Sequence, residues 1–447
     1  MQKVKKILCI QPFDKAVVAT VTVPGDKSIT HRAFLMGAMA CGGSGVTRVH
    51  TPLLSGDTMS TIVALQQLGV QIKEQSGVWE VWGHLGLIGK SGLHPKEMTL
   101  NANNSGTTTR LLLGVLAGAG MKGRVTILGD ASLCKRPMAR IVEPLKIMGA
   151  EIVYCKQEGV LPLCIRGATL QGIRYQLPQA SAQVKSGLLL AGLNAMGSTV
   201  LGGEITSRNH TEILMRQMGA DIAVSEEQIV LRPSVLCGTS VQVVGDVSSA
   251  AFWMVLAALC PHSKIKLPGI CCNPTRTGIL SIFDRCGVQY GVKNLCTDAE
   301  TVGDIEVEYV QDLKPFCISE QDVPSLIDEL PILCVLACFC KDTSCIGGIK
   351  ELLYKESNRI TNIVNNLKQM GANIVAQEEQ IVVVGDGVLQ GGASLDCLGD
   401  HRIVMALAIA ALASKQGAVF EKEHDIQSVA ISYPNFFAEI ENLRKTK

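Results

Sequence analysis

The sequence predicts an α/β protein built from repeated segments of strand and helix. Two recurring patterns carry this prediction. Five times, an amphipathic segment ends at a glycine that an alternating apolar stretch follows. Six times, a polar turn precedes a segment that is apolar on nearly every side. The turns recur about every 75 residues, so six repeats account for the 447-residue chain. An ordinary run of αβ units with chance glycine spacing is the alternative.

The glycine pattern predicts a helix end followed by a β-hairpin. Glycine lacks a Cβ atom and so adopts the left-handed conformation that closes a helix. After the helix expected over 363–370, residues 374–384 form two apolar stretches around a polar turn, which is typical of a hairpin. The glycines of this pattern are Gly69, Gly149, Gly219, Gly287 and Gly371.

The polar turns predict helix starts. The apolar segments that follow these turns, such as residues 110–119, belong in a core. Helix N-termini present free N–H groups and partial positive charge, so six parallel helices in two groups of three would attract anions where they converge. We expect Ser28, Thr107, Ser181 and Ser248 to act as caps or as hydroxyl donors at these starts. The turns lie at 25–28, 104–107, 180–183, 245–248, 322–325 and 399–402.

The last repeat is incomplete, because it ends on the helix expected over 434–444 with no hairpin after it. The N-terminal stretches 7–10 and 16–23 look like a hairpin and could supply the missing strands. This predicts a domain that contains both chain ends.

Composition limits the class of protein. With 41 basic and 40 acidic residues the net charge is +1, which excludes the overall basic field of a nucleic-acid or membrane-surface binder. The odd number of cysteines, 17, lies mostly in apolar runs, so we expect no disulfide framework and no metal site. Residues 1–10 lack the apolar core of a signal peptide, and the longest apolar run, 403–413, is too short for a bilayer. We expect a soluble cytoplasmic protein.

Basic residues concentrate at the turns. A single Lys or Arg is usually a solvated surface charge, but several at helix starts favour binding of phosphate and carboxylate. Neither the P-loop spacing nor the Rossmann glycine pattern is complete, so neither predicts a nucleotide site. The basic residues in question are Lys27, Arg32, Arg110, Arg136, Lys185, Lys355, Arg359 and Arg402.

Two carboxylates are candidates for acid–base chemistry. Asp328 lies among apolar residues, and Glu356 lies between Lys355 and Arg359. Opposite environments shift carboxyl pKa values in opposite directions, so such a pair can act as base and acid. Equally, Asp328 could cap a helix and Glu356 could form a helical surface pair with Arg359. His401 could be catalytic, but no nucleophilic triad accompanies it.

Five motifs, in order and spread over essentially the whole chain, resemble those of the 5-enolpyruvylshikimate-3-phosphate synthase family. The resemblance implies two similar domains, each of three βαβαββ-type repeat units, with helix N-termini converging on an interdomain cleft. Residues 1–25 and 245–447 would form one domain and residues 26–244 the other. The motifs are GDKSITHR at 25–32, NSGTTTR at 104–110, GDASLCKRPM at 129–138, KESNR at 355–359 and GDHR at 399–402.

The resemblance implies a reaction of aromatic amino-acid biosynthesis. The carboxyvinyl group of phosphoenolpyruvate would pass to the 5-hydroxyl of shikimate 3-phosphate through a tetrahedral intermediate, releasing phosphate. No cofactor, metal, nucleic acid or membrane is needed, and a monomer is expected. Carboxyvinyl transfer to a UDP-sugar is one alternative, although that family has Lys-Asn where this chain has Lys27-Ser28, and its reactive Cys lies farther from the arginine than Cys134 does from Arg136. A non-catalytic anion-binding protein is another.

The resemblance also implies residue roles. Asp328 would accept the hydroxyl proton, and Lys27 would stabilise the departing phosphate. The methylene carbon would be protonated by Glu356, with Lys27 the alternative donor. Shikimate 3-phosphate would contact Lys27, Ser28, Arg32, Ser181, Ala182 through its backbone, Gln183, Arg208, Asp328 and Lys355. Phosphoenolpyruvate would contact Lys27, Gly106, Arg136, Gln183, Arg359 and Arg402, and Asn104 belongs to the same substrate-binding set.

Three positions depart from the family pattern. Ala182 replaces a common serine, which leaves only its backbone for binding. His210 replaces a tyrosine, as in the branch that uses Arg208. Ile431 stands where many members have a lysine that grips phosphoenolpyruvate, so one expected contact has no known replacement.

Overall fold

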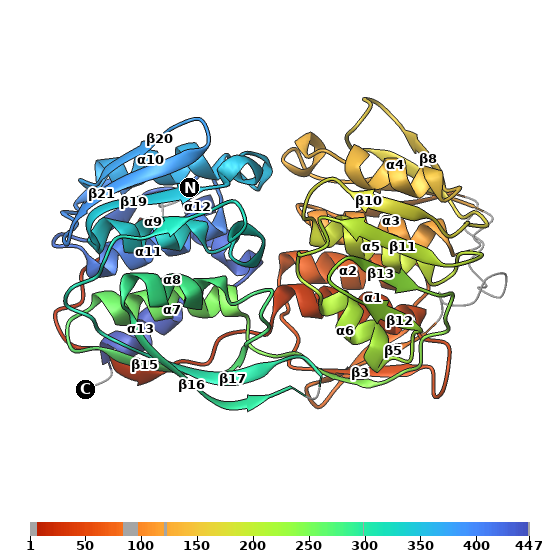
Figure 1. The fold of residues 1–447 in the computed structure, drawn as a ribbon, viewed down its shortest axis with the longest axis horizontal. Coiled ribbons are helices and arrows are strands. Elements are labelled where there is room, and N and C mark those ends of the chain that lie inside the picture. Colours follow the sequence, from red (N-terminus) through yellow and green to blue (C-terminus); the bar gives the residue numbers. More distant parts are fainter. Residues whose placement is uncertain (1–6, 84–96, 120–122, 298, 446–447) are drawn as a thin grey trace, which may run out of the picture. The chain divides into compact units, whose positions relative to one another are not determined.

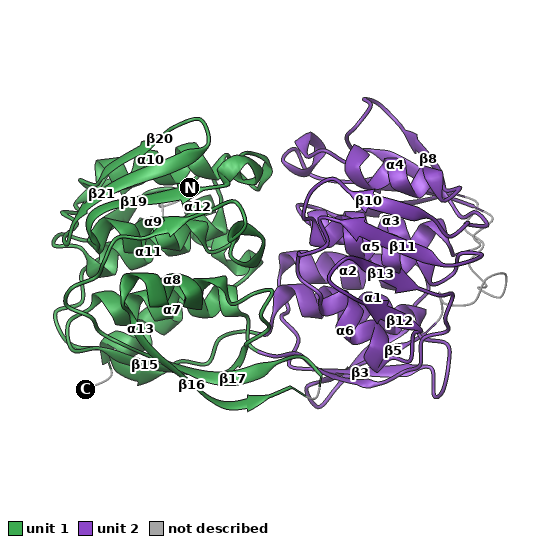
Figure 2. Ribbon diagram, viewed as in Figure 1, with its two compact units in different colours: residues 1–24, 245–447 green, residues 25–244 purple. Residues whose placement is uncertain are grey.

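The computed structural model describes residues 7–83, 97–119, 123–297 and 299–445, and its chain divides into two compact units (Figures 1 and 2). Unit 1 consists of residues 1–24 and 245–447, and unit 2 of residues 25–244. Each unit is a mixed α/β body with three small sheets around buried helices. The predicted α/β class is therefore confirmed. That each unit folds independently, with the boundaries we expected, remains a prediction.

Unit 2 contains three four-stranded sheets with one strand order. In two of them the first strand in sequence lies beside the second, which lies beside the fourth, and the third is at the far edge; in the remaining sheet β14, the last strand of the unit, takes the place of the first. The sheets are β14-β3-β5-β4 (Ser240–Gln242, Val46–His50, Val78–Trp82, Ile72–Gln75), β6-β7-β9-β8 (Glu97–Asn101, Arg124–Leu128, Leu163–Arg166, Glu151–Tyr154) and β10-β11-β13-β12 (Arg174–Leu177, Thr199–Gly203, Gln228–Leu231, Ile222–Val224).

Unit 1 repeats this plan with one incomplete sheet. Two sheets have four strands and the third has three. They are β16-β17-β15-β2 (Gln289–Cys296, Val302–Glu308, Lys264–Cys271, Val18–Thr20), β18-β19-β21-β20 (Cys317–Ile318, Lys341–Gly347, Gln380–Asp386, Asn373–Ala376) and β1-β23-β22 (Leu8–Ile10, Ala418–Phe420, Ala393–Leu395).

One repeat shows how the sequence pattern becomes structure. Strands β6 and β7 are parallel and are joined by a buried helix, α3 (Gly106–Ala117). A second helix, α4 (Ala139–Ile147), leads to the antiparallel hairpin β8–β9, whose second strand pairs with β7. This is the expected βαβαββ unit. The hairpin predicted over 374–384 likewise exists, as β20 and β21.

Six helices form the two cores. Nearly every residue of these helices is buried, because the small sheets and the outer helices cover them. Figure 1 shows α3 beside α5 in unit 2 and α9 beside α11 in unit 1, in agreement with their packing contacts. The core helices are α1 (Lys27–Met39), α3 and α5 (Ala182–Gly192) in unit 2, and α7 (Val247–Leu259), α9 (Leu330–Phe339) and α11 (His401–Ala413) in unit 1.

The remaining helices lie outside the cores and are amphipathic. No helix of the described residues is long and apolar enough to cross a bilayer. The outer helices are α2 (Gly56–Gln67), α4, α6 (His210–Gln217), α8 (Gly278–Cys286), α10 (Arg359–Gln369), α12 (Glu423–Ser428) and α13 (Phe436–Lys445), with short 3₁₀ turns η1 (Leu133–Lys135), η2 (Val323–Ser325), η3 (Ile349–Tyr354) and η4 (Val429–Ile431).

All five glycines of the repeated pattern adopt the left-handed conformation that the sequence predicts. Their φ angles are +87° at Gly69, +100° at Gly149, +86° at Gly219, +82° at Gly287 and +91° at Gly371. Each lies one or two residues after the last residue of an outer helix. The helix ends were therefore encoded locally.

The predicted N-terminal hairpin is wrong. Strand β1 pairs antiparallel with β23, whereas β2 pairs parallel with β15 in a different sheet. Instead of turning, the intervening segment packs on neighbouring helices: the Phe13 amide donates to the Leu412 carbonyl at 3.0 Å, and the Arg444 guanidinium lies over the Phe13 ring. The N-terminus thus supplies one strand to each of two sheets, which leaves the last sheet with three strands.

Capping, one of the two roles expected of the residues at the helix starts, is found at only one of them. Of the four expected residues, only Ser181 is an N-cap, accepting a hydrogen bond from the Val184 amide. Ser28, Thr107 and Ser248 lie inside the first turn, because Asp26, Ser105 and Asp246 cap those helices instead. The turn at 322–325 begins the 3₁₀ turn η2, and α9 starts only at Leu330.

Candidate functional site

In unit 2, the first turn of α1 presents a lysine. Asp26 caps the helix by accepting from the Ile29 amide, which leaves Lys27 as the first helical residue. The Lys27 ammonium donates to the Asp57 carboxylate in the first turn of α2 at 3.0 Å, and both side chains are mostly buried. An anion that reached Lys27 would therefore compete with the Asp57 carboxylate for the ammonium group, or share that group with it.

Arg32 lies one turn further into α1 and is almost wholly buried. Its Nε and Nη2 donate to the hydroxyls of Thr211 and Ser186, each at 2.7 Å, and its Nη1 donates to the Ser28 carbonyl. These partners are neutral oxygens. Arg32 thus joins α1 to α5 and α6.

Arg208 lies on the loop that precedes α6. Its Nη1 donates to the Ser28 hydroxyl at 3.1 Å, so the structure brings these two predicted residues together. Ser181 caps α5, and Ala182 and Gln183 are its first two residues. All of these side chains are half-buried.

The start of α3 carries a second set of predicted residues. The Arg136 Nη2 donates to the Asn104 side-chain oxygen at 2.7 Å, and the Asn104 amide donates to Asp130 at 2.6 Å. Gln183 connects this set to α5, because it accepts from Arg110 at 2.5 Å and donates to Thr107. The structure therefore orients Arg136 through a carboxylate–amide relay.

Gly106 is the first residue of α3 and is closely surrounded. A Cβ built on it would lie 2.9 Å from Arg110 Nη1 and 3.4 Å from Arg136 Nη1. Its backbone can thus sit beside two guanidinium groups only because it has no side chain.

His31 lies buried behind the unit 2 helix starts. Its Nδ1 is 2.7 Å from the Thr61 hydroxyl. Burial, followed by the nearby charges of Lys27 and Arg32, lowers the His31 pKa well below its ordinary value. His31 is therefore a neutral ring that does not cancel the positive charge around it.

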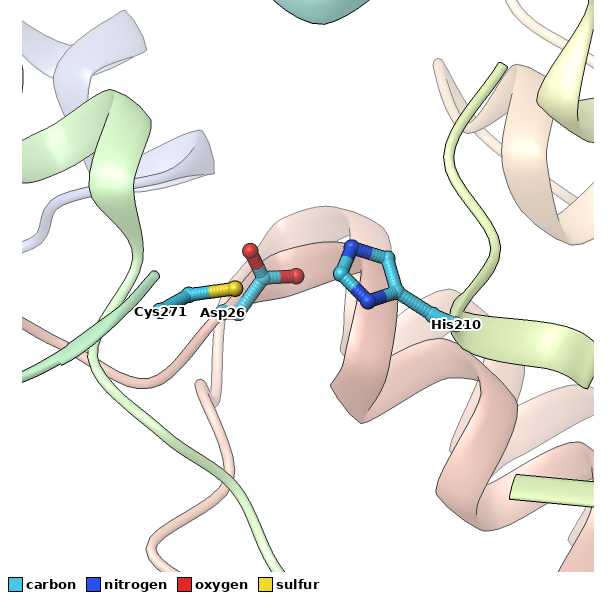
Figure 3. Close-up of side chains that lie close together, drawn as sticks. All are labelled: Asp26, His210 and Cys271. Carbon is cyan, nitrogen blue, oxygen red and sulfur yellow. The ribbon is translucent and has the colours of Figure 1, made fainter. Parts of the chain in front are cut away.

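His210, the first residue of α6, lies near the start of α1. Figure 3 shows its ring turned toward the Asp26 carboxylate, and the nearest ligand atoms of the two side chains lie within 4.8 Å. Cys271, also drawn in Figure 3, belongs to unit 1. Within unit 2, no third Cys, His, Asp or Glu among the described residues joins this pair as a metal-ligating group.

In unit 1, three cations surround Asp328. Lys355 Nζ and Arg359 Nη1 each lie 3.6 Å from its Oδ1, and Arg402 Nη2 lies 3.6 Å from its Oδ2. Only 11% of the Asp328 side chain is exposed. Asp328 is not a helix cap, because Glu329 occupies that position of α9.

Arg359 lies between three carboxylates. Its Nε donates to Asp400 at 2.8 Å and its Nη2 to Glu356 at 2.5 Å. Burial acts against the charged form, but Asp400, Glu356 and Asp328 outweigh it and raise the Arg359 pKa. The Glu356–Arg359 pair that the sequence offered as a surface contact thus exists, with its arginine buried.

Sequence reasoning missed the carboxylates that hold these cations. Asp57, Asp130 and Asp400 each orient a predicted cationic residue, directly or through Asn104. Only Asp130 and Asp400 lay in quoted motifs, and no signal marked either as a partner. Ile431, which the resemblance sets at a position where many members have a lysine, lies in η4.

A buried network of four polar side chains in unit 1 was not predicted from the sequence. Ser248 donates to Glu329, and Arg276 donates to Ser248 at 2.8 Å and to Asp246 at 3.3 Å. All four side chains are nearly inaccessible. Arg276 belongs to no motif, so its place in the network follows from the fold alone.

Comparison with protein families and curated proteins gives full-length matches. A family model described as EPSP synthase (3-phosphoshikimate 1-carboxyvinyltransferase) matches residues 13–440. The 3-phosphoshikimate 1-carboxyvinyltransferase of Bacillus cytotoxicus is 41% identical over 435 residues, which is 96% of this chain and 99% of the relative. The protein of that name from Streptococcus pyogenes serotype M2 is 44% identical over 95% of this chain and 96% of its own.

Two solved structures are similar to this chain over nearly its whole length. EPSP synthase from Acinetobacter baumannii is 37% identical and has a TM-score of 0.84, with 98% of each chain covered. The enolpyruvyl transferase NikO from Streptomyces tendae has a TM-score of 0.74 over 98% of this chain and 97% of its own. It is only 15% identical, so this likeness shows the fold alone.

Proposed function

The chain belongs to the EPSP synthase (3-phosphoshikimate 1-carboxyvinyltransferase) family, and on this premise we propose how its residues perform the family's reaction. The resemblance stated from the motifs is thereby confirmed. The enzyme transfers the carboxyvinyl group of phosphoenolpyruvate to the 5-hydroxyl of shikimate 3-phosphate and releases phosphate. The assignment of individual residues to substrates and steps is the proposal.

The residues of unit 2 supply most of the proposed contacts to shikimate 3-phosphate. Ser28 and Arg208 lie together at the start of α1, and a helix N-terminus with a nearby arginine is suited to phosphate. The set is Lys27, Ser28, Arg32, Ser181, the Ala182 backbone, Gln183 and Arg208, with Asp328 and Lys355 of unit 1.

Phosphoenolpyruvate would bind to guanidinium groups already oriented by acceptors. Arg136 is held by Asn104, and Arg359 by Asp400, so each presents a fixed fork to a phosphate or carboxylate. In this scheme Asn104 acts by orienting Arg136. The complete set is Lys27, Asn104, Gly106, Arg136, Gln183, Arg359 and Arg402.

Asp328 is the proposed base. Three cations at 3.6 Å, and not the apolar environment that its neighbours in the sequence suggested, favour its ionised form, which is the form that accepts a proton. In the addition step, the substrate 5-hydroxyl loses its proton to Asp328 as its oxygen attacks C2 of phosphoenolpyruvate. The methylene carbon C3 gains a proton at the same time, and the tetrahedral intermediate forms.

Glu356 is the proposed donor of that second proton, with Lys27 the alternative. The Glu356 carboxylate accepts from Arg359, which favours its ionised form in the free enzyme. An anionic substrate group on Arg359 would replace this bond and let Glu356 take up the proton it must deliver. In the elimination step, the C3 methyl group returns a proton to the group that donated it, and the C2–O bond to phosphate breaks, with Lys27 stabilising the leaving phosphate.

The single observation that carries the proposal is the cluster of three cations around Asp328. The test is a phosphate-release assay that requires both substrates, applied to Asp328→Asn and Glu356→Gln. Each change should lower kcat by about 10²–10⁴-fold, because each removes a proton-transfer group. Asp14→Asn and Glu378→Gln, at exposed positions, are matched controls that should retain full activity. Normal turnover in either site variant would exclude that residue's role.

The same assay separates the two acceptor classes. We expect no phosphate release when a UDP-sugar replaces shikimate 3-phosphate.

We also propose a monomer in a reducing cytoplasm, where exposed thiols such as Cys9 and Cys237 stay reduced. Light scattering during size-exclusion chromatography tests the first part, and a dimer mass at micromolar concentration would overturn it.

A further inference from the structure

Lys185 is a buried lysine that the proposed mechanism does not use. It lies in α5, one turn after Ser181, and 1% of its side chain is exposed. Its Nζ lies 2.8 Å from Glu212 Oε1, 2.7 Å from the Ser207 carbonyl oxygen and 3.0 Å from the Ile205 carbonyl oxygen. An ammonium group has three N–H donors, so this site uses all of them.

Two of these acceptors belong to the loop that carries Arg208. Ile205 and Ser207 follow β11, and Arg208 is the next residue before α6 begins at His210. Glu212, which is also nearly fully buried, lies in the first turn of α6. Lys185 therefore ties the loop before α6 to the helix that Ser181 caps.

Fold stability alone does not require a charge here. Burial lowers the Lys185 pKa, and the Glu212 carboxylate opposes that shift. An apolar pair of similar volume often stabilises a core as well as a buried ion pair does. However, an apolar pair cannot donate to the inward-facing carbonyls of Ile205 and Ser207, which need partners once buried.

We propose that Lys185 is a positioning residue that sets the main chain at 205–207 and thereby places the Arg208 guanidinium for the phosphate of shikimate 3-phosphate. This inference rests on the proposed function, which assigns Arg208 to that substrate. Lys185 itself contacts no substrate. Without its two bonds to the loop, Arg208 would have to be ordered each time substrate binds, and the affinity would fall by that cost.

The decisive variant is the double substitution Lys185→Met with Glu212→Leu. It removes both charges together, so no uncompensated charge stays buried, and the melting temperature should fall less than in Lys185→Met alone. The loop carbonyls nevertheless lose their donor. Calorimetric titration with shikimate 3-phosphate alone should show affinity reduced about tenfold, the order expected for a lost charged hydrogen bond. The KM for phosphoenolpyruvate should be unchanged.

A double-mutant cycle with Arg208→Ala tests whether the effect passes through Arg208. We expect Arg208→Ala alone to weaken the binding of shikimate 3-phosphate. In the Arg208→Ala background, the Lys185 and Glu212 substitutions should weaken it no further. Additive losses would show that Lys185 acts elsewhere and would overturn the inference. Lys146→Met, at an exposed lysine of α4, is the matched control and should bind like the wild type.

A ligand-free readout separates this inference from the proposed function. Trypsin should cleave after Arg208 faster in the double variant than in the wild type, because the loop has lost its bonds. Wild-type protein that fails to bind shikimate 3-phosphate would overturn the proposed function, whatever trypsin shows. A double variant with wild-type affinity and wild-type cleavage would overturn the role of Lys185. Should that variant not fold, Lys185→Gln, whose shorter amide cannot reach both carbonyls, is expected to show the same two effects.

Discussion

At Gly106, a missing side chain leaves room beside two guanidinium groups. A Cβ at this position would lie 2.9 Å from Arg110 Nη1, which is closer than carbon and nitrogen atoms normally approach. Arg110 is held by Gln183 at 2.5 Å, so it cannot move without breaking that bond. Added volume at residue 106 would therefore disturb the anion site before it disturbs the core.

We predict that Gly106→Ala raises the KM for phosphoenolpyruvate by about tenfold, roughly the loss of one charged hydrogen bond. Its kcat and its affinity for shikimate 3-phosphate should change much less. Steady-state phosphate release at varied phosphoenolpyruvate measures this. Gly56→Ala, whose added Cβ meets nothing within 4 Å, is the control. An unchanged KM would mean that phosphoenolpyruvate does not approach this backbone.

His31 predicts a dependence of stability on pH. Its folded-state pKa is lowered, chiefly by burial, so the unfolded chain binds a proton at this ring before the folded protein does. Stability should therefore fall as the pH drops below about 6.5, by about 1.4 kcal/mol per pH unit down to the folded-state pKa. Above that window, the ring is neutral in both states and contributes no slope.

His31→Asn should remove this slope. Urea unfolding at about pH 7 and about pH 5 gives the two free energies for each protein. His424→Asn is the control, because 60% of the His424 side chain is exposed. Equal pH slopes for the wild type and His31→Asn would contradict the prediction.

Individual residues differ in how far the sequence could place them. Lys27, Arg136, Arg359 and Arg402 could be picked out because they stand in short motifs beside polar turns. Their carboxylate partners could not, because Asp57 and Asp400 lie 30 and 41 residues away from Lys27 and Arg359. Which acid meets which base depends on how separate helices pack, and no local pattern records that.

At the scale of elements, helix ends were predicted more accurately than helix starts. A left-handed residue after a helix strongly favours glycine, so Gly219 and its four counterparts left an unambiguous signal. Caps are less selective, since Asp, Ser and Thr all serve. Asp26 and Asp246, two residues before the expected serines, took those positions.

We predict that Gly219→Ala costs about 1 kcal/mol of unfolding free energy, from backbone strain alone. Its φ is +86°, and an added Cβ there would meet nothing within 4 Å. Gly56→Ala at the first residue of α2 also meets open space, but without a left-handed backbone, so it should be neutral or slightly stabilising. Denaturant unfolding of both variants measures the difference. A loss shared equally by both would exclude backbone strain as its cause.

At the scale of the whole molecule, each unit closes on itself with a strand from a distant part of the chain. In unit 2, β14 near the end of the unit pairs in parallel with β3 near its start. In unit 1, β2 from the N-terminal segment pairs in the same way with β15. The first repeat of each unit is thus completed by a strand that is distant in sequence. In unit 2 this strand is β14, at the end of the unit, and in unit 1 it is β2, in the N-terminal segment.

We predict that residues 25–244 fold as an isolated fragment with a cooperative thermal transition. This segment contains three complete sheets and its own buried helices, so it needs no strand from unit 1. A fragment of residues 25–238 is the matched test, because it lacks β14 and leaves an edge of β3 unpaired. It should melt at a lower temperature by circular dichroism. A fragment 25–244 without a transition would overturn the prediction of an independent domain.

Sequence alone was enough to predict the α/β class, the repeated helix–glycine–hairpin pattern and the cationic motifs, because each depends on neighbours along the chain. It misplaced the N-terminal strands, since alternating residues at 7–10 and 16–23 predict two strands but not the sheets they join. Only the tertiary structure decided those pairings, the carboxylates that hold each cation, and the three bonds of Lys185. These features arise from contacts between distant segments, whose geometry is set by packing.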